Sequence, residues 1–219
     1  MVAEKVRLIE YSERVDFFNC VTHAIGAVLS VIGFAVMVFN ADGARKIISA
    51  LIFGLSLIAV YTVSAVYHGL KNGEAKRMAR LIDHSAIPFL IAGTATPCAL
   101  ITLYEISVPH SMAVLILAWF CAVFGLVSKV FFFEKLRKVT VAVYIISCAL
   151  MIGCALPLLG DIDTEAFFGI LLGCVFYLIG AAFCGLGIKR PTMHVVFHVF
   201  CILASLTHYL VIYEYIVLK

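Results

Sequence analysis

The stretch Met193-His194-Val195-Val196-Phe197-His198 opens an apolar run that continues to Leu218 and reads MHVVFHVFCILASLTHYLVIYEYIVL over residues 193–218. As an α-helix, a run of this length is long enough to cross a hydrocarbon core about 30 Å thick. His194 and His198 are four residues apart, so their β-carbons lie about 5–6 Å apart on one helix face, close enough to share a metal ion. The stretch therefore predicts a membrane helix with two candidate metal ligands near its start.

The whole chain has the composition of an integral membrane protein. Of its 219 residues, 64% are hydrophobic and 13% are charged, which leaves too little polar surface to cover a water-soluble globule. No cleavable signal peptide is expected, because the first dozen residues are charged and the first apolar run is too long. The eight cysteines lack CxxC spacing and are interpreted as small buried hydrophobes, not as a disulfide framework.

Apolar segments of about 20 residues recur along the chain and predict an all-α fold, a seven-transmembrane helix bundle. The connectors are too short for a second domain, so residues 17–219 are expected to form a single seven-helix membrane domain. Residues 1–16 are expected to form a cytoplasmic amphipathic tail at the membrane surface. The expected spans are residues 17–39, 47–69, 81–103, 111–131, 139–159, 166–187 and 194–217.

The basic residues predict how the bundle is oriented. With a cytoplasmic N-terminus, thirteen of the sixteen lysines and arginines fall in cytoplasmic segments, and only Arg45, Lys46 and Lys219 fall outside. The positive-inside rule favours this orientation. Because the number of spans is odd, the C-terminus is then expected outside the cell.

This topology places five polar side chains at one depth near the cytoplasmic face. Ser64 and His68 lie at the end of the second span, Asp83 at the start of the third, and His194 and His198 at the start of the seventh. Polar groups at this depth are costly, so they are expected to face one another inside the bundle. Three imidazoles from two helices suit zinc and leave a fourth tetrahedral position open for water or substrate.

Two further residues of this layer have candidate catalytic roles. Asp83 is expected to accept a proton from the reacting water or to orient a histidine. Ser64 is expected to hydrogen-bond the same water or a substrate carbonyl. Structural interpretations stay open beside these: a metal-free histidine cluster, an ion pair of Asp83 with Arg80, and a hydrogen bond from Ser64 to its own helix backbone.

Two more histidines have different expected places. His23, with Asn19 one turn before it, lies toward the cytoplasmic side and is expected either to support the cluster as an outer partner or to form an interhelical hydrogen bond. His208 lies about 15 Å further along the helix axis than His198, too far to share the metal. It is expected to serve packing or a polar contact toward the outer half of the bundle.

Together these motifs resemble the hemolysin III family, which is related to the progestin and adiponectin-receptor (PAQR) family and more distantly to alkaline ceramidases. The resemblance rests on Ser64-x3-His68, on Asp83 after a basic loop, and on His194-x3-His198. It implies a seven-helix bundle with the N-terminus inside and a zinc ion held by the three histidines, with Asp83 and Ser64 at accompanying polar positions. The first span adds further matching residues: Glu13, Asn19, Thr22, His23 and Gly26.

Three functions are compatible with these patterns. The first is a zinc-dependent membrane hydrolase of a lipid amide or ester, which the open metal position beside Asp83 suggests. The second is a non-enzymatic membrane sensor or receptor-like protein with structural zinc. The third is a cytolysin, which only the family name suggests, since the polar residues gather at one end and trace no path across the bilayer.

The expected partners are membrane lipids, including a lipid-derived substrate. No basic patch indicates nucleic-acid binding. The short termini and the absence of a large receptor tail favour the bacterial inner (plasma) membrane as the location.

Overall fold

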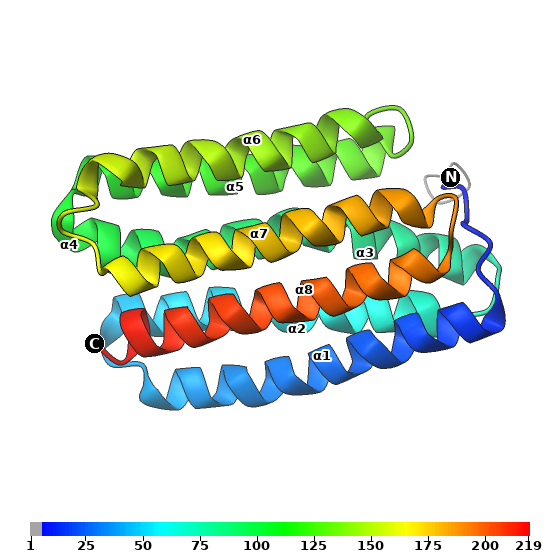
Figure 1. Cartoon of the computed structure of the whole chain (residues 1–219), viewed down its shortest axis with the longest axis horizontal. Helices are drawn as coiled ribbons and strands as arrows, with labels where there is room; N and C mark the ends of the chain where they lie inside the picture. Colours follow the sequence, from blue (N-terminus) through cyan, green and yellow to red (C-terminus); the bar gives the residue numbers. More distant parts are fainter. Residues whose placement is uncertain (1–5) are drawn as a thin grey trace.

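The structure is a computed structural model that describes residues 6–219 (Figure 1). Seven helices within this range are long and apolar enough to cross a membrane, and the range contains no strand. The chain is therefore an integral multi-pass membrane protein with an all-α fold, which confirms the predicted fold class. Residues 6–12 contain no helix, and residues 1–5 of the predicted amphipathic tail lie outside the described residues.

Each predicted span corresponds to one spanning segment. The helices begin two to seven residues before the predicted spans; at Glu13 and Glu74 this is because the first turn contains charged residues that hydropathy excludes. The segments are α1 (Glu13–Asn40), α2 (Gly43–Gly69), α3 (Glu74–Pro97) continued by η2 (Cys98–Leu103) and α4 (Tyr104–Ile106), α5 (Val108–Phe132), α6 (Arg137–Ala155) continued by η3 (Leu156–Leu158), α7 (Thr164–Gly187), and α8 (Thr192–Val211) continued by η4 (Ile212–Val217).

Helices that follow one another in sequence mostly pack side by side. α1 packs on α2, α2 on α3, α3 on α5, α5 on α6 and α7 on α8, while α8 returns to α1. The first described residues and the C-terminus lie at opposite ends of the bundle (Figure 1). The N-terminal end also holds the α2–α3, α5–α6 and α7–α8 connections, so the described segments predicted to be cytoplasmic share one end. Which side of the membrane this end faces stays a prediction.

Close contacts between α1, α2 and α8 align the helices that carry the histidines. A β-carbon at Gly26 of α1 would lie 2.6 Å from the ring of Tyr61, so only glycine allows this approach. The Tyr61 hydroxyl reaches across to α8, where it donates to the Cys201 carbonyl at 2.9 Å and contacts the Ser205 hydroxyl at 2.7 Å. These contacts fix the depth of α8 relative to α2.

His208 contributes to helix packing further along α8. Its ring lies against Gly173 of α7, where a β-carbon would be 2.1 Å from the ring. Its Nε2 lies 2.9 Å from the carbonyl oxygen of Ile170, also in α7. The packing role predicted for His208 is thereby confirmed.

Candidate metal centre

Three histidines converge at the N-terminal end of the bundle. α2 ends one residue after His68, and α8 carries His194 and His198 in its first two turns. The candidate ligand nitrogens of the three side chains all lie within 4.8 Å of one another, and the ring centroids are 4.7, 5.0 and 5.4 Å apart. This spacing suits three imidazole ligands of one shared metal ion. The structure brings together the three histidines that the sequence singled out.

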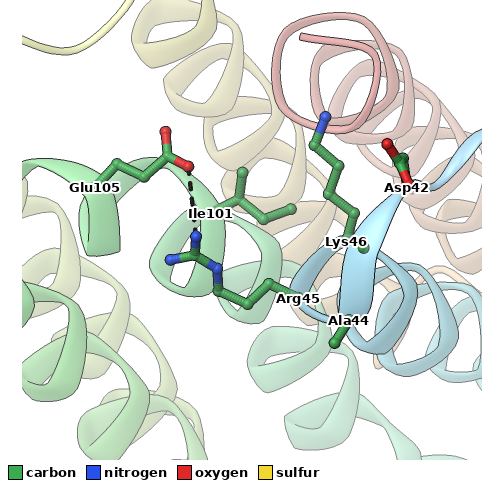
Figure 2. A pocket seen from close by; sticks show the side chains of 7 residues that line it. Asp42, Ala44, Arg45, Lys46, Ile101 and Glu105 are labelled. Carbon is green, nitrogen blue, oxygen red and sulfur yellow. Dashed lines mark ion pairs between the residues drawn. The ribbon is translucent and has the colours of Figure 1, made fainter.

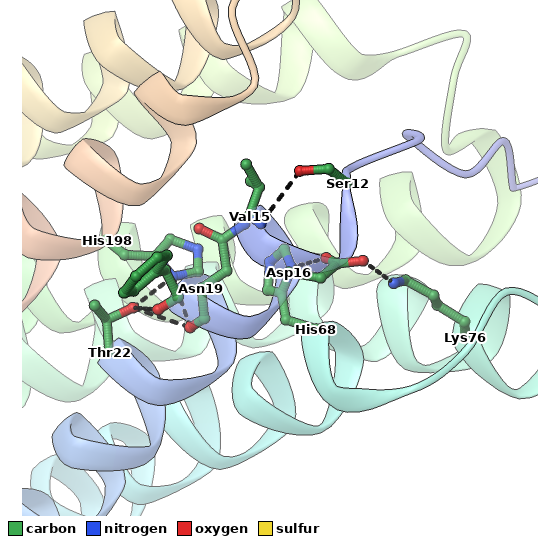
Figure 3. Close-up of polar contacts among 9 residues, drawn as sticks. Ser12, Val15, Asp16, Asn19, Thr22, His68, Lys76 and His198 are labelled. Carbon is green, nitrogen blue, oxygen red and sulfur yellow. Dashed lines mark hydrogen bonds and ion pairs between the residues drawn. The ribbon is translucent and has the colours of Figure 1, made fainter.

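The hydrogen bonds of His68 and His198 leave one nitrogen of each ring for a metal (Figure 3). Nδ1 of His68 lies 2.8 Å from Oδ1 of Asp16, and Nδ1 of His198 lies 3.2 Å from the carbonyl oxygen of Asn19 and 3.3 Å from the Thr22 hydroxyl. Because a carboxylate and a carbonyl only accept, Nδ1 carries the proton in both rings and Nε2 keeps its lone pair. This arrangement is typical of metal-binding histidines, whose second nitrogen donates to an oxygen.

Asp16 is a site residue that the sequence analysis missed. The Ser12 hydroxyl accepts from the Val15 amide at 3.4 Å and caps α1, which places Asp16 in the first turn of the helix. Its second oxygen accepts from Nζ of Lys76 at 2.5 Å. The signal that could have found it is helical spacing, since Asp16, Asn19 and His23 occupy positions i, i+3 and i+7 of one face.

Tyr11 was also missed and covers two of the histidines. Its ring stacks on His194 with centroids 5.3 Å apart and an angle of 27° between the planes, and its centroid lies 5.6 Å from that of His68. Burial raises the pKa of the Tyr11 phenol, so the side chain stays neutral. No motif marks this residue in the sequence.

The segment that carries Tyr11 is anchored to the far side of the bundle end. Val6 is only 1% exposed and packs with Leu81 of α3 and Phe133 of the α5–α6 turn. The guanidinium of Arg77 donates to the Val6 carbonyl at 2.9 Å. Residues 6–12 therefore form a strap, the N-terminal strap, that crosses the bundle end and lays Tyr11 over the histidines.

Asp83 and Ser64 lie together, one helical turn along α2 from His68. The Ser64 hydroxyl lies close to the half-buried carboxyl group of Asp83. Asp83 is not part of the group of ligand atoms within 4.8 Å. Among the described residues, Arg80 forms its ion pair with Glu134 at 3.7 Å, not with Asp83.

His23 and Asn19 adjoin the histidine set from α1. The His23 ring stacks on that of His198 with centroids 3.6 Å apart and 14° between the planes, and it meets Tyr61 edge to face at 5.0 Å. Both ring nitrogens of His23, both side-chain polar atoms of Asn19 and Nε2 of His68 are buried without a hydrogen-bond partner among the described residues. Such unsatisfied groups are rare in folded proteins and are found where a site binds a ligand or an ion.

A separate pocket lies at the opposite end of the bundle, at the α1–α2 connection (Figure 2). It has a volume of about 260 Å³, and the Arg45–Glu105 ion pair crosses it at 3.7 Å. None of the predicted site residues lines it. The lining residues are Asp42, Gly43, Ala44, Arg45, Lys46, Ile101 and Glu105.

Comparison with known proteins identifies the family. The haemolysin-III related family model matches residues 11–209. Hemolysin-3 of Bacillus cereus is 31% identical over 202 residues, 91% of this chain and 90% of the relative. Hemolysin-3 homolog of Bacillus subtilis is 31% identical, over 84% of this chain and 86% of the relative.

A mammalian relative extends the comparison. Monocyte to macrophage differentiation factor of Homo sapiens is 26% identical over 90% of this chain and 83% of its own length, which supports the predicted relation to the PAQR family. The seven apolar helices and the bacterial relatives together support an integral protein of the plasma membrane. Because the family model covers most of the chain and two relatives exceed 30% identity, this chain belongs to the haemolysin-III related family.

Proposed function

We propose that the protein is a zinc-dependent membrane hydrolase that acts on a lipid-derived amide or ester. The observation that carries the proposal is the convergence of His68, His194 and His198, whose ligand atoms lie within 4.8 Å of one another. Two of these rings have Nδ1 engaged with oxygen atoms and so have Nε2 free. Together with His194 they would supply three imidazole ligands and leave one tetrahedral position free.

The residues around the histidines suggest a division of roles. A zinc ion at such a site supplies Lewis acidity, which polarises a carbonyl and lowers the pKa of water. Asp83 would accept the proton of the attacking water and deliver it to the leaving group. Ser64, beside Asp83, would orient that carboxylate or hydrogen-bond the substrate carbonyl. The Tyr11 ring would limit access of bulk water from the bundle end.

The chemistry of the surroundings favours a lipid-derived substrate. The three histidines lie at the ends of helices long and apolar enough to span a membrane, so the site would lie where a hydrocarbon core meets its polar boundary. A lipid amide or ester has its scissile carbonyl at this boundary, with its acyl chain in the hydrocarbon. A water-soluble substrate would instead have to pass the N-terminal strap.

A membrane sensor with structural zinc is the second candidate. It is favoured by the position of the histidines on α2 and α8, because one ion would link these two helices. It is also favoured by Tyr11, which covers the ligands on one side. This protein would bind zinc and gain stability from it without turning over any lipid.

Metal analysis followed by a turnover assay separates these candidates. Detergent-purified wild type is expected to contain about one zinc per chain, and a His194→Ala/His198→Ala variant none. His110→Ala, in which the lost ring contacts Ser107 instead, is the control and should keep its metal. Hydrolysis of a fluorescent long-chain N-acyl amide or fatty ester, lost in Asp83→Asn with zinc retained, would support the hydrolase. Zinc without turnover of either probe would favour the sensor, and a folded wild type without metal would refute both.

A further inference from the structure

We infer that Asp16 is a positioning residue for the metal centre: its carboxylate holds His68 in the tautomer and orientation that direct Nε2 to the ion, and Lys76 holds the carboxylate. This inference rests on the proposed zinc site and does not depend on hydrolysis. Figure 3 shows Asp16 between His68 and Lys76, with one carboxylate oxygen directed to each.

The contacts join three helices through one side chain. Asp16 lies in α1, His68 in α2 and Lys76 in α3. Oδ1 accepts from Nδ1 of His68 at 2.8 Å and Oδ2 accepts from Nζ of Lys76 at 2.5 Å. Because each oxygen has its own partner, rotation of the carboxylate would break both hydrogen bonds. The orientation of the His68 ring is therefore fixed through its Nδ1.

The carboxylate also selects the His68 tautomer. An ionised carboxylate only accepts hydrogen bonds, so the proton of the neutral imidazole resides on Nδ1 and the lone pair on Nε2. Nε2 is buried and has no hydrogen-bond partner among the described residues. Without Asp16 the ring could carry its proton on Nε2, and in that form Nε2 cannot bind a metal. An anionic acceptor also makes the imidazole a more basic ligand.

Lys76 completes the arrangement from α3. Its side chain is only 2% exposed, against 16% for Asp16, and its Nζ lies 5.5 Å from the centroid of the Tyr67 ring. A buried ammonium is costly unless it is paired, and its ion-pair partner among the described residues is Asp16. Lys76 therefore fixes the Asp16 carboxylate, which in turn orients His68.

A purely structural clamp between α1, α2 and α3 would need the same contacts, so stability alone cannot test the inference. Metal affinity and the geometry of the bound ion can. A clamp predicts that variants of Asp16 melt earlier in their metal-free form but bind metal as the wild type does. A positioning residue predicts weaker binding and an altered ligand field even in a variant that stays folded.

The test uses the full-length protein in detergent, with zinc affinity measured by chelator competition and bound Co²⁺ followed by its visible absorption. Asp16→Ala is expected to weaken zinc binding about 10- to 100-fold, the usual range for outer hydrogen-bond partners of metal ligands. Asp16→Asn keeps an acceptor oxygen without the charge, so a smaller loss with a shifted Co²⁺ spectrum is expected. Glu13→Gln is the matched control, because Glu13 is exposed in the same helical turn and should bind zinc like the wild type.

The outcomes separate the positioning role, the zinc centre and the hydrolase activity. Wild-type zinc affinity and Co²⁺ spectrum in folded Asp16→Asn would overturn the positioning role while the zinc centre stands. Failure of the wild type to bind either ion would overturn the zinc centre and the positioning role together. Zinc binding that depends on Asp16 in a protein without lipid turnover would support the inference and refute only the hydrolase.

Discussion

The two ends of the bundle handle charge in opposite ways. At the histidine end, Lys76 is 2% exposed and pairs with a carboxylate that is 16% exposed. At the opposite end, the side chains of Arg45 and Glu105 are 48% and 67% exposed. Exposed ion pairs contribute about 0–1 kcal/mol to the stability of the fold because water screens them. Removing one partner of a buried ion pair destabilises the fold strongly, because it leaves a buried charge unpaired.

This contrast shows that the charged side chains of the pair at the histidine end are buried and those of the pair at the opposite end are exposed. Buried polar groups without partners, such as those of His23 and Asn19, occur beside the histidines. A bundle built for stability alone would place apolar side chains there, as it does in the cluster around Phe53 and Leu57. Among the described residues, unpartnered buried polar atoms also occur at Ser49, Tyr144 and His208, but those of His23 and Asn19 lie against the three candidate metal ligands, which supports the proposed site at this end.

Removal of the metal is the change with the largest expected effect on this contrast. An ion held at about a thousand times its dissociation constant stabilises by about 4 kcal/mol, equivalent to roughly 10 °C in melting temperature for a chain of this size. A chelator should therefore lower the melting temperature of the wild type and leave His198→Ala unaffected. Thermal unfolding followed by circular dichroism checks this. An unchanged melting temperature in wild type stripped of its zinc would show that the metal does not link α2 to α8.

The second prediction compares the buried Lys76–Asp16 pair with the exposed Arg45–Glu105 pair. Lys76→Met leaves the Asp16 carboxylate with His68 alone and should lower the free energy of unfolding by about 3 kcal/mol. Arg45→Met, which breaks the exposed pair with Glu105, should cost about 1 kcal/mol or less. Denaturant unfolding in detergent measures both variants. Equal costs would mean that water reaches the Lys76–Asp16 pair as freely as it reaches the pair at the far end.

Much of this architecture could be predicted from the sequence. Each span must satisfy its backbone hydrogen bonds within its own helix, so hydropathy alone located the seven segments. The four-residue spacing of His194 and His198, and the position of His68 at the same end of the bundle, were enough to assemble the histidine set. Helical spacing similarly pointed to Asn19 and His23, which the structure places against His198.

The site residues that were not predicted from the sequence are those whose burial depends on how helices and connecting segments pack against one another. Lys76 belongs to a basic connector and looks like any lysine at a membrane surface, but the packing of α3 on α2 buries it. Tyr11 and Asp16 fell within the segment interpreted as a tail, while the exposed Glu13 was noted instead. Helical spacing from Asn19 and His23 could have indicated Asp16, but the burial of Lys76 and the position of Tyr11 arise from tertiary packing, which neither hydropathy nor spacing contains.

The third prediction concerns access to the histidine end. Tyr11→Ala removes the ring that stacks on His194 and should speed the release of zinc to a water-soluble chelator about tenfold, equivalent to about 1.4 kcal/mol of the barrier. Tyr104→Ala, at the opposite end over Arg45, is the control and should release zinc at the wild-type rate. Stopped-flow measurement with a chromogenic chelator follows both. Equal rates in the two variants would mean that the N-terminal strap does not limit access to the ion.

The fourth prediction, with the smallest expected effect, concerns the Asp163–Lys219 ion pair at the end of the bundle opposite the histidines. The ammonium of Lys219 lies 2.7 Å from Oδ2 of Asp163 and lowers the pKa of this carboxyl group. The backbone amides of Ala166 and Glu165 donate to Oδ1 of Asp163 and lower its pKa further. Because the folded pKa lies below the unfolded value of about 4, the stabilisation is present above pH 4 and is lost as the pH falls through the folded pKa.

Asp163→Asn keeps the helix cap but removes this dependence, so its melting temperature should fall less than that of wild type between pH 5 and about pH 3. Asp161→Asn in the same loop serves as the control. The difference should shrink in high salt, because the pair is exposed and screened. Any metal bound at the histidine end would also be lost in acid, because imidazole ligands protonate, so the comparison is made with metal-free protein. If the melting temperature of Asp163→Asn depends on pH as steeply as that of wild type, other groups cause the dependence. The Asp163–Lys219 pair then makes no measurable contribution to stability.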